Sequence, residues 1–107
     1  MKDLEFLGSS QKDIAKFPGS AKSVAGFQLH RVQVGLAPSD WKPMGSVGVG
    51  VREIRINVQA QFRVIYVAKY QGKVYVLHAF EKKTQKTEKR DIELAKVRLK
   101  GIDNDHN

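Results

Sequence analysis

The spacing of apolar residues predicts a helix in the first third of this chain. Between residues 20 and 36 apolar side chains recur at steps of three or four, which places them on one face of a helix. These positions are Ala21, Ala25, Leu29, Val32 and Leu36. Ser20 is expected to begin this helix and Gly35 to cap its end.

The residues before this helix predict a strand and a shorter helix. Three of the four residues in 4–7 are apolar and indicate a short opening strand. Ser9 or Ser10 can cap the brief helix that follows, and the run Phe17-Pro18-Gly19 must end it. A pair of helices is therefore expected near the N-terminus.

Strand patterns dominate the second half of the chain. Residues 37–50 are rich in Pro and Gly and predict one long connection. Alternating or continuous apolar runs then predict strands at 51–56, 62–67 and 73–80, with a turn at Gln71-Gly72 before the last. The middle run is apolar on both faces, as a central strand would be. We expect these three strands to form an antiparallel meander.

A final helix is predicted after Thr87, which can cap it. Its acidic residues come early and its basic residues late, the order that the helix dipole favours. The apolar stripe consists of Ile92, Ala95, Leu99 and Ile102. Residues 103–107 are expected to form a frayed tail. The element order predicts a single α+β domain over residues 1–107, with a small antiparallel sheet, an N-terminal helix pair and a C-terminal helix.

Composition narrows the classes of partner. The 107 residues include 19 Lys and Arg against 11 Asp and Glu, a formal net charge of +8. Such an excess favours polyanionic partners. The absence of cysteine excludes disulfides and thiolate chemistry. The sequence shows neither a signal-peptide core nor an apolar run near the roughly 18 residues of a membrane span, so a cytoplasmic protein is expected.

Arginines on two neighbouring strands are the first candidates for chemistry. Arg63 is the only charge in an apolar central strand, and a charge there needs a partner or an open cleft. Arg52 and Arg55 lie on the strand expected beside it, so the three guanidinium groups could converge. Guanidinium groups hold phosphate oxygens through paired hydrogen bonds, which favours a phosphodiester such as RNA. The alternative is that each is a solvated cation at a strand end.

Lys82, Lys83 and Lys86 follow the last predicted strand, where loops commonly present functional groups. Neighbouring cations lower one another's pKa from about 10.4 towards the range in which a lysine can donate a proton at neutral pH. One of these lysines could therefore act as an acid, whereas the alternative is a solvated charge run.

His78 alternates with Val76 and Phe80, so it is expected on their side of the sheet. It is either a packed structural histidine or a general base. The histidines at 30, 78 and 106 show no ligand spacing. No catalytic metal and no other cofactor is expected.

Five segments carry a family resemblance through their order and spacing: KDIAKFP at 12–18, KPMG at 42–45, GVREIR at 50–55, FRVIY at 62–66 and HAFEKKT at 78–84. With them the chain resembles the RelE/ParE toxin superfamily over about residues 10–100, specifically its HigB-like group of phage-derived proteins. The resemblance implies a βααβββα fold, metal-independent cleavage of mRNA in the ribosomal A site, and neutralisation by a helix-turn-helix antitoxin of the HigA-like kind.

The resemblance also assigns expected roles to residues. The family's phosphate-binding arginine falls on Arg63, its basic residue on the preceding strand on Arg55, and its basic residue after the last strand on Lys82 or Lys83. Glu53 stands where a second lysine is expected, and no tyrosine follows in the last helix. The general base therefore stays open between His78 and Glu53.

The expected function is a toxin that acts as a metal-independent endoribonuclease, with mRNA, the ribosome and the antitoxin as partners. The residues expected to carry it are Arg63, Arg55, Lys82, Lys83 and His78 for catalysis, and Arg52 and Lys86 for RNA binding. The alternative is a non-enzymatic protein, either a ParE-like topoisomerase inhibitor or a basic RNA-binding domain.

Overall fold

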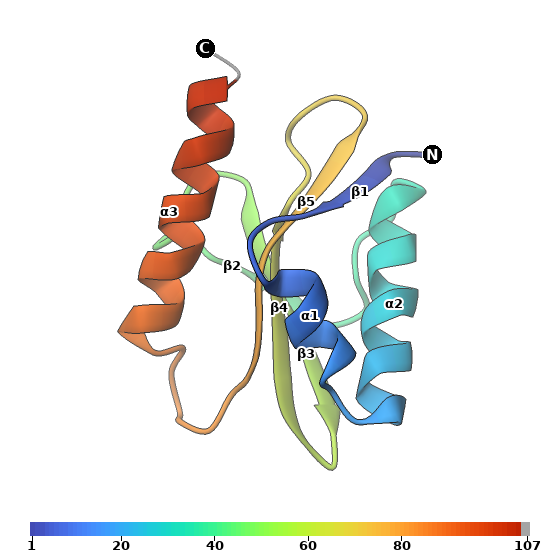
Figure 1. Ribbon diagram of the computed structural model, residues 1–107. Coiled ribbons are helices and arrows are strands. Elements are labelled where there is room, and N and C mark those ends of the chain that lie inside the picture. Colours follow the sequence, from blue (N-terminus) through green and yellow to red (C-terminus); the bar gives the residue numbers. More distant parts are fainter. Residues whose placement is uncertain (106–107) are drawn as a thin grey trace.

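A five-stranded sheet forms the centre of the protein, with α1 and α2 against one face and α3 against the other (Figure 1). The computed structural model describes residues 1–105. The elements in chain order are β1 (Asp3–Phe6), α1 (Ser10–Ala15), α2 (Gly19–Gln33), β2 (Trp41–Pro43), β3 (Val51–Val58), β4 (Ala60–Val67), β5 (Lys73–Glu81) and α3 (Lys89–Asp105).

The strands lie in the order β1-β5-β4-β3-β2. The α+β fold is confirmed, and so is the antiparallel meander of β3, β4 and β5 with β4 between its two neighbours. The sheet is mixed rather than wholly antiparallel, because β1 pairs parallel with β5. The prediction of an irregular connection over 37–50 is wrong for Trp41–Pro43, which pair with β3 as a short edge strand. Pro43 fits there because an edge strand need not use every N–H group in the ladder.

Helix α2 follows its predicted apolar face closely. Four of the five predicted positions are buried, but Leu36 is 52% exposed. The helix ends at Gln33, and Gly35 adopts a φ of 90° that turns the chain away. The Leu36 amide then donates to the Arg31 carbonyl at 2.8 Å, a C-terminal cap that a glycine in this conformation permits.

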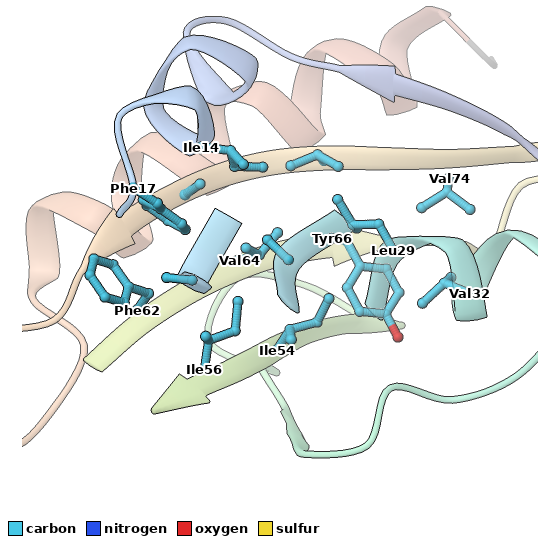
Figure 2. Close-up of a cluster of buried hydrophobic side chains, with 14 residues drawn as sticks. Ile14, Phe17, Leu29, Val32, Ile54, Ile56, Phe62, Val64, Tyr66 and Val74 are labelled. Carbon is cyan, nitrogen blue, oxygen red and sulfur yellow. The ribbon is translucent and has the colours of Figure 1, made fainter. Parts of the chain in front are cut away.

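The face of the sheet under α1 and α2 carries one continuous apolar cluster (Figure 2). The residues labelled in Figure 2 are Ile14, Phe17, Leu29, Val32, Ile54, Ile56, Phe62, Val64, Tyr66 and Val74. The rings of Phe17 and Phe62 join the turn after α1 to β4 at a centroid distance of 4.7 Å. Alternate positions along β3 and β4 thus face these two helices.

The opposite face carries a second apolar cluster that covers only part of it. Helix α3 contributes Ala95, Leu99 and Ile102, and the turn before β3 contributes Met44 and Val47. They pack on the part of the sheet formed by Val51, Ile65, Val67, Tyr75 and Leu77. Glu53, Arg55 and Arg63 occupy the remaining part of this face.

Two predictions at the ends of α3 are corrected. Thr87 does not cap the helix, because the Glu88 carbonyl accepts the amides of Asp91 and Ile92, while the Thr87 hydroxyl donates to Glu53. The frayed tail is wrong for residues 103–105, which continue the helix because Ile102 still anchors its last turn in the apolar cluster. The rest of the predicted tail, 106–107, lies outside the described residues.

A β-bulge in β5 changes which residues share a face. His78 pairs with Ile65 and Val76 pairs with Tyr66, so Leu77 is an extra residue on β5. Leu77 therefore packs in the α3 cluster while Val76 packs in the α1/α2 cluster. The prediction that His78 lies on the side of Val76 is wrong, because the bulge interrupts the alternation.

Within residues 1–105, none of the helices combines the length and the apolar character needed to cross a membrane.

Candidate functional site

A buried acid and a buried arginine lie beside each other on the α3 face. Glu53 on β3 has an exposed fraction of 0% and Arg63 on β4 one of 4%. Arg63 Nε lies 3.7 Å from Glu53 Oε1, and neither atom has a hydrogen-bond partner among the described residues. The partner that a charge in this apolar strand requires is therefore a carboxylate two positions along on the neighbouring strand.

The guanidinium of Arg63 is held in place by its strand and hairpin. Nη1 donates to the Phe62 carbonyl at 2.9 Å and to Asn57 Oδ1 at 3.4 Å, and Nη2 donates to Gln61 Oε1 at 3.4 Å. Burial lowers the pKa of Arg63, while the negative charge of Glu53 opposes that shift. Arginine nevertheless remains charged in proteins. This side chain is a fixed positive charge rather than a mobile one.

Glu53 also connects two segments far apart in the sequence. Its Oε2 accepts the Thr87 hydroxyl at 2.8 Å, and its Oε1 lies 3.8 Å from Lys42 Nζ. Lys42 comes from edge strand β2, and Thr87 from the loop between β5 and α3. The carboxylate thus joins β2, β3, β4 and that loop at one point.

Arg55 lies opposite Arg63 in the β3–β4 ladder, so their side chains project from the same face. Arg55 is paired with Asp40, with Nε and Nη2 each 2.9 Å from Oδ1. The Arg55 side chain is 39% exposed, so solvent reaches it. Arg55 is therefore the accessible member of the arginine pair.

Lys82 follows the end of β5 and completes the site. Its amide donates to the Gln61 carbonyl at 2.7 Å, which places it beside the start of β4. Its pKa is lowered, first by burial and then by the positive charges of Arg63 and Lys42. We call Lys42, Glu53, Arg55, Arg63 and Lys82 the charged cluster; it contains four cations and one carboxylate.

The other two predicted lysines lie outside the charged cluster. Lys83 and Lys86 are exposed in the loop before α3. Lys83 lines a hollow of about 270 Å³ between the end of β5 and the start of α3, together with Lys82, Arg90 and Asp91. This hollow lies next to the charged cluster, because Lys82 belongs to both.

The predicted convergence of three arginines is correct for Arg55 and Arg63 and wrong for Arg52. Arg52 pairs with Tyr66, whose ring packs in the α1/α2 cluster, so Arg52 projects from the other face. Its guanidinium carbon lies 4.0 Å from the centre of the Trp41 ring. Alternation along β3 separates Arg52 from Arg55, because three positions along a strand exchange faces.

His78 is tied to α3. Its Nε2 lies 2.7 Å from Asp91 Oδ1, and its ring stacks on Phe80 at a centroid distance of 5.1 Å. The ring is buried, and Nδ1 has no hydrogen-bond partner among the described residues. These contacts fit the alternative of a packed, hydrogen-bonded histidine that joins β5 to α3.

Sequence reasoning did not single out four residues that complete the site, namely Asp40, Lys42, Thr87 and Asp91. Two of them lie in the segment predicted as an irregular connection, where three residues of strand are too few to show alternation. Lys42 does fall within the KPMG segment of the family resemblance, which was the available signal. Thr87 resembles a helix cap in sequence and is used differently.

Among residues 1–105, no group of three or more His, Asp or Glu side chains is placed to hold a metal ion. His106 lies outside the described residues. What the charged cluster can do chemically follows from its four cations: attract a phosphate, stabilise negative charge that develops on it, and donate a proton from a lysine whose pKa is lowered.

Comparison with known proteins identifies the family. No curated protein matches the sequence. Residues 12–100 match the family described as phage derived protein Gp49-like (DUF891). The match spans the chain from α1 to the last turns of α3 and includes every residue of the charged cluster. It agrees with the phage-derived, RelE-like part of the resemblance. The chain belongs to the Gp49-like family of phage-derived proteins.

Proposed function

We propose that this protein is the toxin of a toxin-antitoxin system, of the HigB-like kind, and that it cleaves mRNA on the ribosome without a metal ion. The observation that carries the proposal is the charged cluster, in which Lys42 and Arg63 pair with the buried Glu53, and Arg55 and Lys82 lie close enough to interact with these charges. Family membership supports a phage-derived toxin. A helix-turn-helix antitoxin would neutralise it.

The proposed reaction is attack by the 2′-hydroxyl of the substrate on the adjacent phosphorus. The O2′–P bond forms as the P–O5′ bond breaks, so the 2′-hydroxyl loses a proton to solvent water and the leaving 5′-oxygen gains one. Lys82 is the donor of the second proton. Its lowered pKa supports this role, because an ammonium group whose pKa lies below the ordinary value gives up its proton more readily than an ordinary lysine does.

The arginines stabilise the negative charge that develops on the phosphate. Arg55 is accessible and can contact phosphate oxygens, provided that Asp40 releases it. Arg63 acts as a fixed charge behind the surface, since its side chain is 5% exposed and its Nη atoms are already bonded. A preorganised charge in a dry site costs little reorganisation during the reaction.

Neither predicted general base is assigned. Glu53 is fully buried and held by Thr87, and the Nε2 atom of His78 is bonded to Asp91. Each would have to change its contacts to reach a 2′-hydroxyl. The proposal therefore depends on the cations and the acid.

The decisive experiment is single-turnover cleavage of mRNA on purified ribosomes, with 5′ ends mapped at nucleotide resolution. Lys82→Ala is expected to slow the bound reaction by about 10²-fold. A substrate with a 5′-bridging sulfur, which leaves without a proton, should recover most of that loss. Lys12→Ala, which removes an exposed lysine from α1, is the control and should cleave normally.

Two outcomes would contradict the proposal. One is an unchanged single-turnover rate for Lys82→Ala at saturation, which would remove the acid from the mechanism. The other is growth arrest with DNA damage and intact messages, which would favour the ParE-like topoisomerase inhibitor.

A further inference from the structure

A second cationic site lies on the opposite face of the sheet. A cavity of about 500 Å³ opens between the end of α2, the start of β3 and the end of β4. It is lined by the cations Lys2, Arg52 and Lys69 and by the apolar side chains of Val32 and Leu36. Among the described residues that line it, none is acidic. Its volume falls within the range of small-molecule sites, about 300–1,000 Å³.

A buried hydroxyl also lines this cavity. Tyr66 is 1% exposed, and its hydroxyl oxygen has no hydrogen-bond partner of good geometry among the described residues, although Arg52 lies beside it. Figure 2 shows this oxygen at the edge of the apolar cluster, pointing away from Val64. A buried polar group without a partner is costly and calls for an explanation. Burial raises the pKa of Tyr66, so at neutral pH the group is a proton-bearing donor.

None of the three cations around the cavity forms a short ion pair with a carboxylate among the described residues. Lys2 Nζ donates to the Ala68 carbonyl at a long 3.4 Å, and Lys69 Nζ lies 3.8 Å from Asp103 Oδ1. Arg52 stacks on Trp41 and has no carboxylate within ion-pair distance among the described residues. Each therefore keeps hydrogen-bonding capacity for a ligand.

The C-terminus of α2 at this cavity would repel an anion if its carbonyl groups were free. They are occupied. The amides of Val34, Gly35 and Leu36 donate to carbonyls of the last turn, and Arg31 Nε donates to the Ala37 carbonyl at 3.0 Å. The net charge around the cavity is therefore positive.

We propose that this cavity binds a phosphate monoester of mononucleotide size. Its phosphate would lie among Lys2, Arg52 and Lys69 with the Tyr66 hydroxyl as a further donor, and its organic part would pack on Val32 and Leu36. A phosphate monoester carries a charge of about −1.5 to −2 at pH 7, which suits three cations better than a carboxylate does. This site goes beyond the proposed function, since it lies on the other face from the charged cluster.

Trp41 offers a direct test, because it is the only tryptophan and Arg52 stacks on its ring. Adenosine monophosphate is the probe. Its binding should change Trp41 fluorescence until the site is saturated, and its affinity should be higher than that of inorganic phosphate. Adenosine should have no effect. Tyr66→Phe and Arg52→Gln should each weaken the affinity about tenfold, and circular dichroism should show both variants folded.

Lys82→Ala is the control that separates the two faces, because it removes a cation from the charged cluster and should leave the affinity for adenosine monophosphate unchanged. The proposal fails if fluorescence does not saturate by millimolar concentrations or if adenosine acts equally. Undiminished affinity in folded Tyr66→Phe protein also overturns it, as does loss of binding in Lys82→Ala. Equal affinity for inorganic phosphate would overturn the assignment to an organic ligand.

Discussion

The two faces of the sheet differ in what their buried residues do. Under α1 and α2, the buried residues of β3 and β4 are Ile54, Ile56, Phe62, Val64 and Tyr66, and all are apolar or aromatic. Under α3, the same two strands present the apolar pair Val51 and Val67 at one end, then Glu53 opposite Ile65, and then Arg55 opposite Arg63. Both faces are built by alternation along the same strands.

The difference follows from how much of each face the helices cover. Helix α3 contributes three buried apolar residues to its face and packs on β5, whereas two helices cover the opposite face. Where α3 does not reach, Glu53 and Arg63 are buried by pairing with each other and by the hairpin around them. One face therefore provides apolar stability, and the other combines apolar packing with a charged surface.

Of the changes that test this difference between the two faces, breaking the buried pair of Glu53 and Arg63 should have the largest effect on stability. Glu53→Gln keeps the size of the side chain but removes the negative charge between Arg63 and Lys42. Arg63 would then be buried without a carboxylate, which typically costs about 3–5 kcal/mol of unfolding free energy. Urea unfolding followed by circular dichroism measures the loss.

Asp40→Asn is the matched control, because it breaks the ion pair of Arg55, in which both side chains are partly exposed. Exposed pairs contribute about 0–1 kcal/mol. Comparable losses in the two variants would show that the burial of Glu53 and Arg63 has no special role in stability.

The sequence was sufficient to predict the elements with strong periodicity. The apolar pattern of α2, of the strands β3, β4 and β5 and of α3 repeats over several turns or residues in each element. Together these elements determine the α+β fold. The sequence also predicted that Arg63 would need a partner. It did not identify Glu53 as that partner, because the register between β3 and β4 is set by the whole hairpin.

The remaining errors have local causes that a single sequence hides. One extra residue at Leu77 places His78 on the α3 face, and a bulge has no marker here such as glycine. Three residues of β2 bring Lys42 to Glu53, although their sequence resembles a loop. Arg52 and Arg55 are both arginines of β3. They lie on opposite faces only because an odd number of positions separates them along the strand.

The hydrogen bond between His78 on β5 and Asp91 on α3 provides the next test of the difference between the two faces. Asp91→Ala removes the partner of His78 Nε2, so the buried ring would have no hydrogen bond from a described residue. An unsatisfied buried polar group costs about 1–3 kcal/mol, and urea unfolding should show a loss in that range. Glu93→Ala is the control on the same helix, since Glu93 is exposed and its loss should change stability by at most about 0.5 kcal/mol. A loss no larger than that of the control would mean that His78 contributes little to docking α3.

The smallest expected effect concerns the proton on Lys82. Its folded pKa lies below that of an unfolded lysine, about 10.4, because burial and the charges of Arg63 and Lys42 disfavour the ammonium form. Between the two values the unfolded state binds more protons, so this residue makes stability rise with pH through that window. Lys82→Met removes the penalty. The variant should therefore be more stable than the wild type near neutral pH, by less than about 1 kcal/mol, and the gain should shrink as pH approaches 10.4.

Urea unfolding at several pH values measures the difference, with Lys83→Met as the control for losing a lysine from the same loop. The same pH dependence in both variants would show that the charged cluster does not act on Lys82.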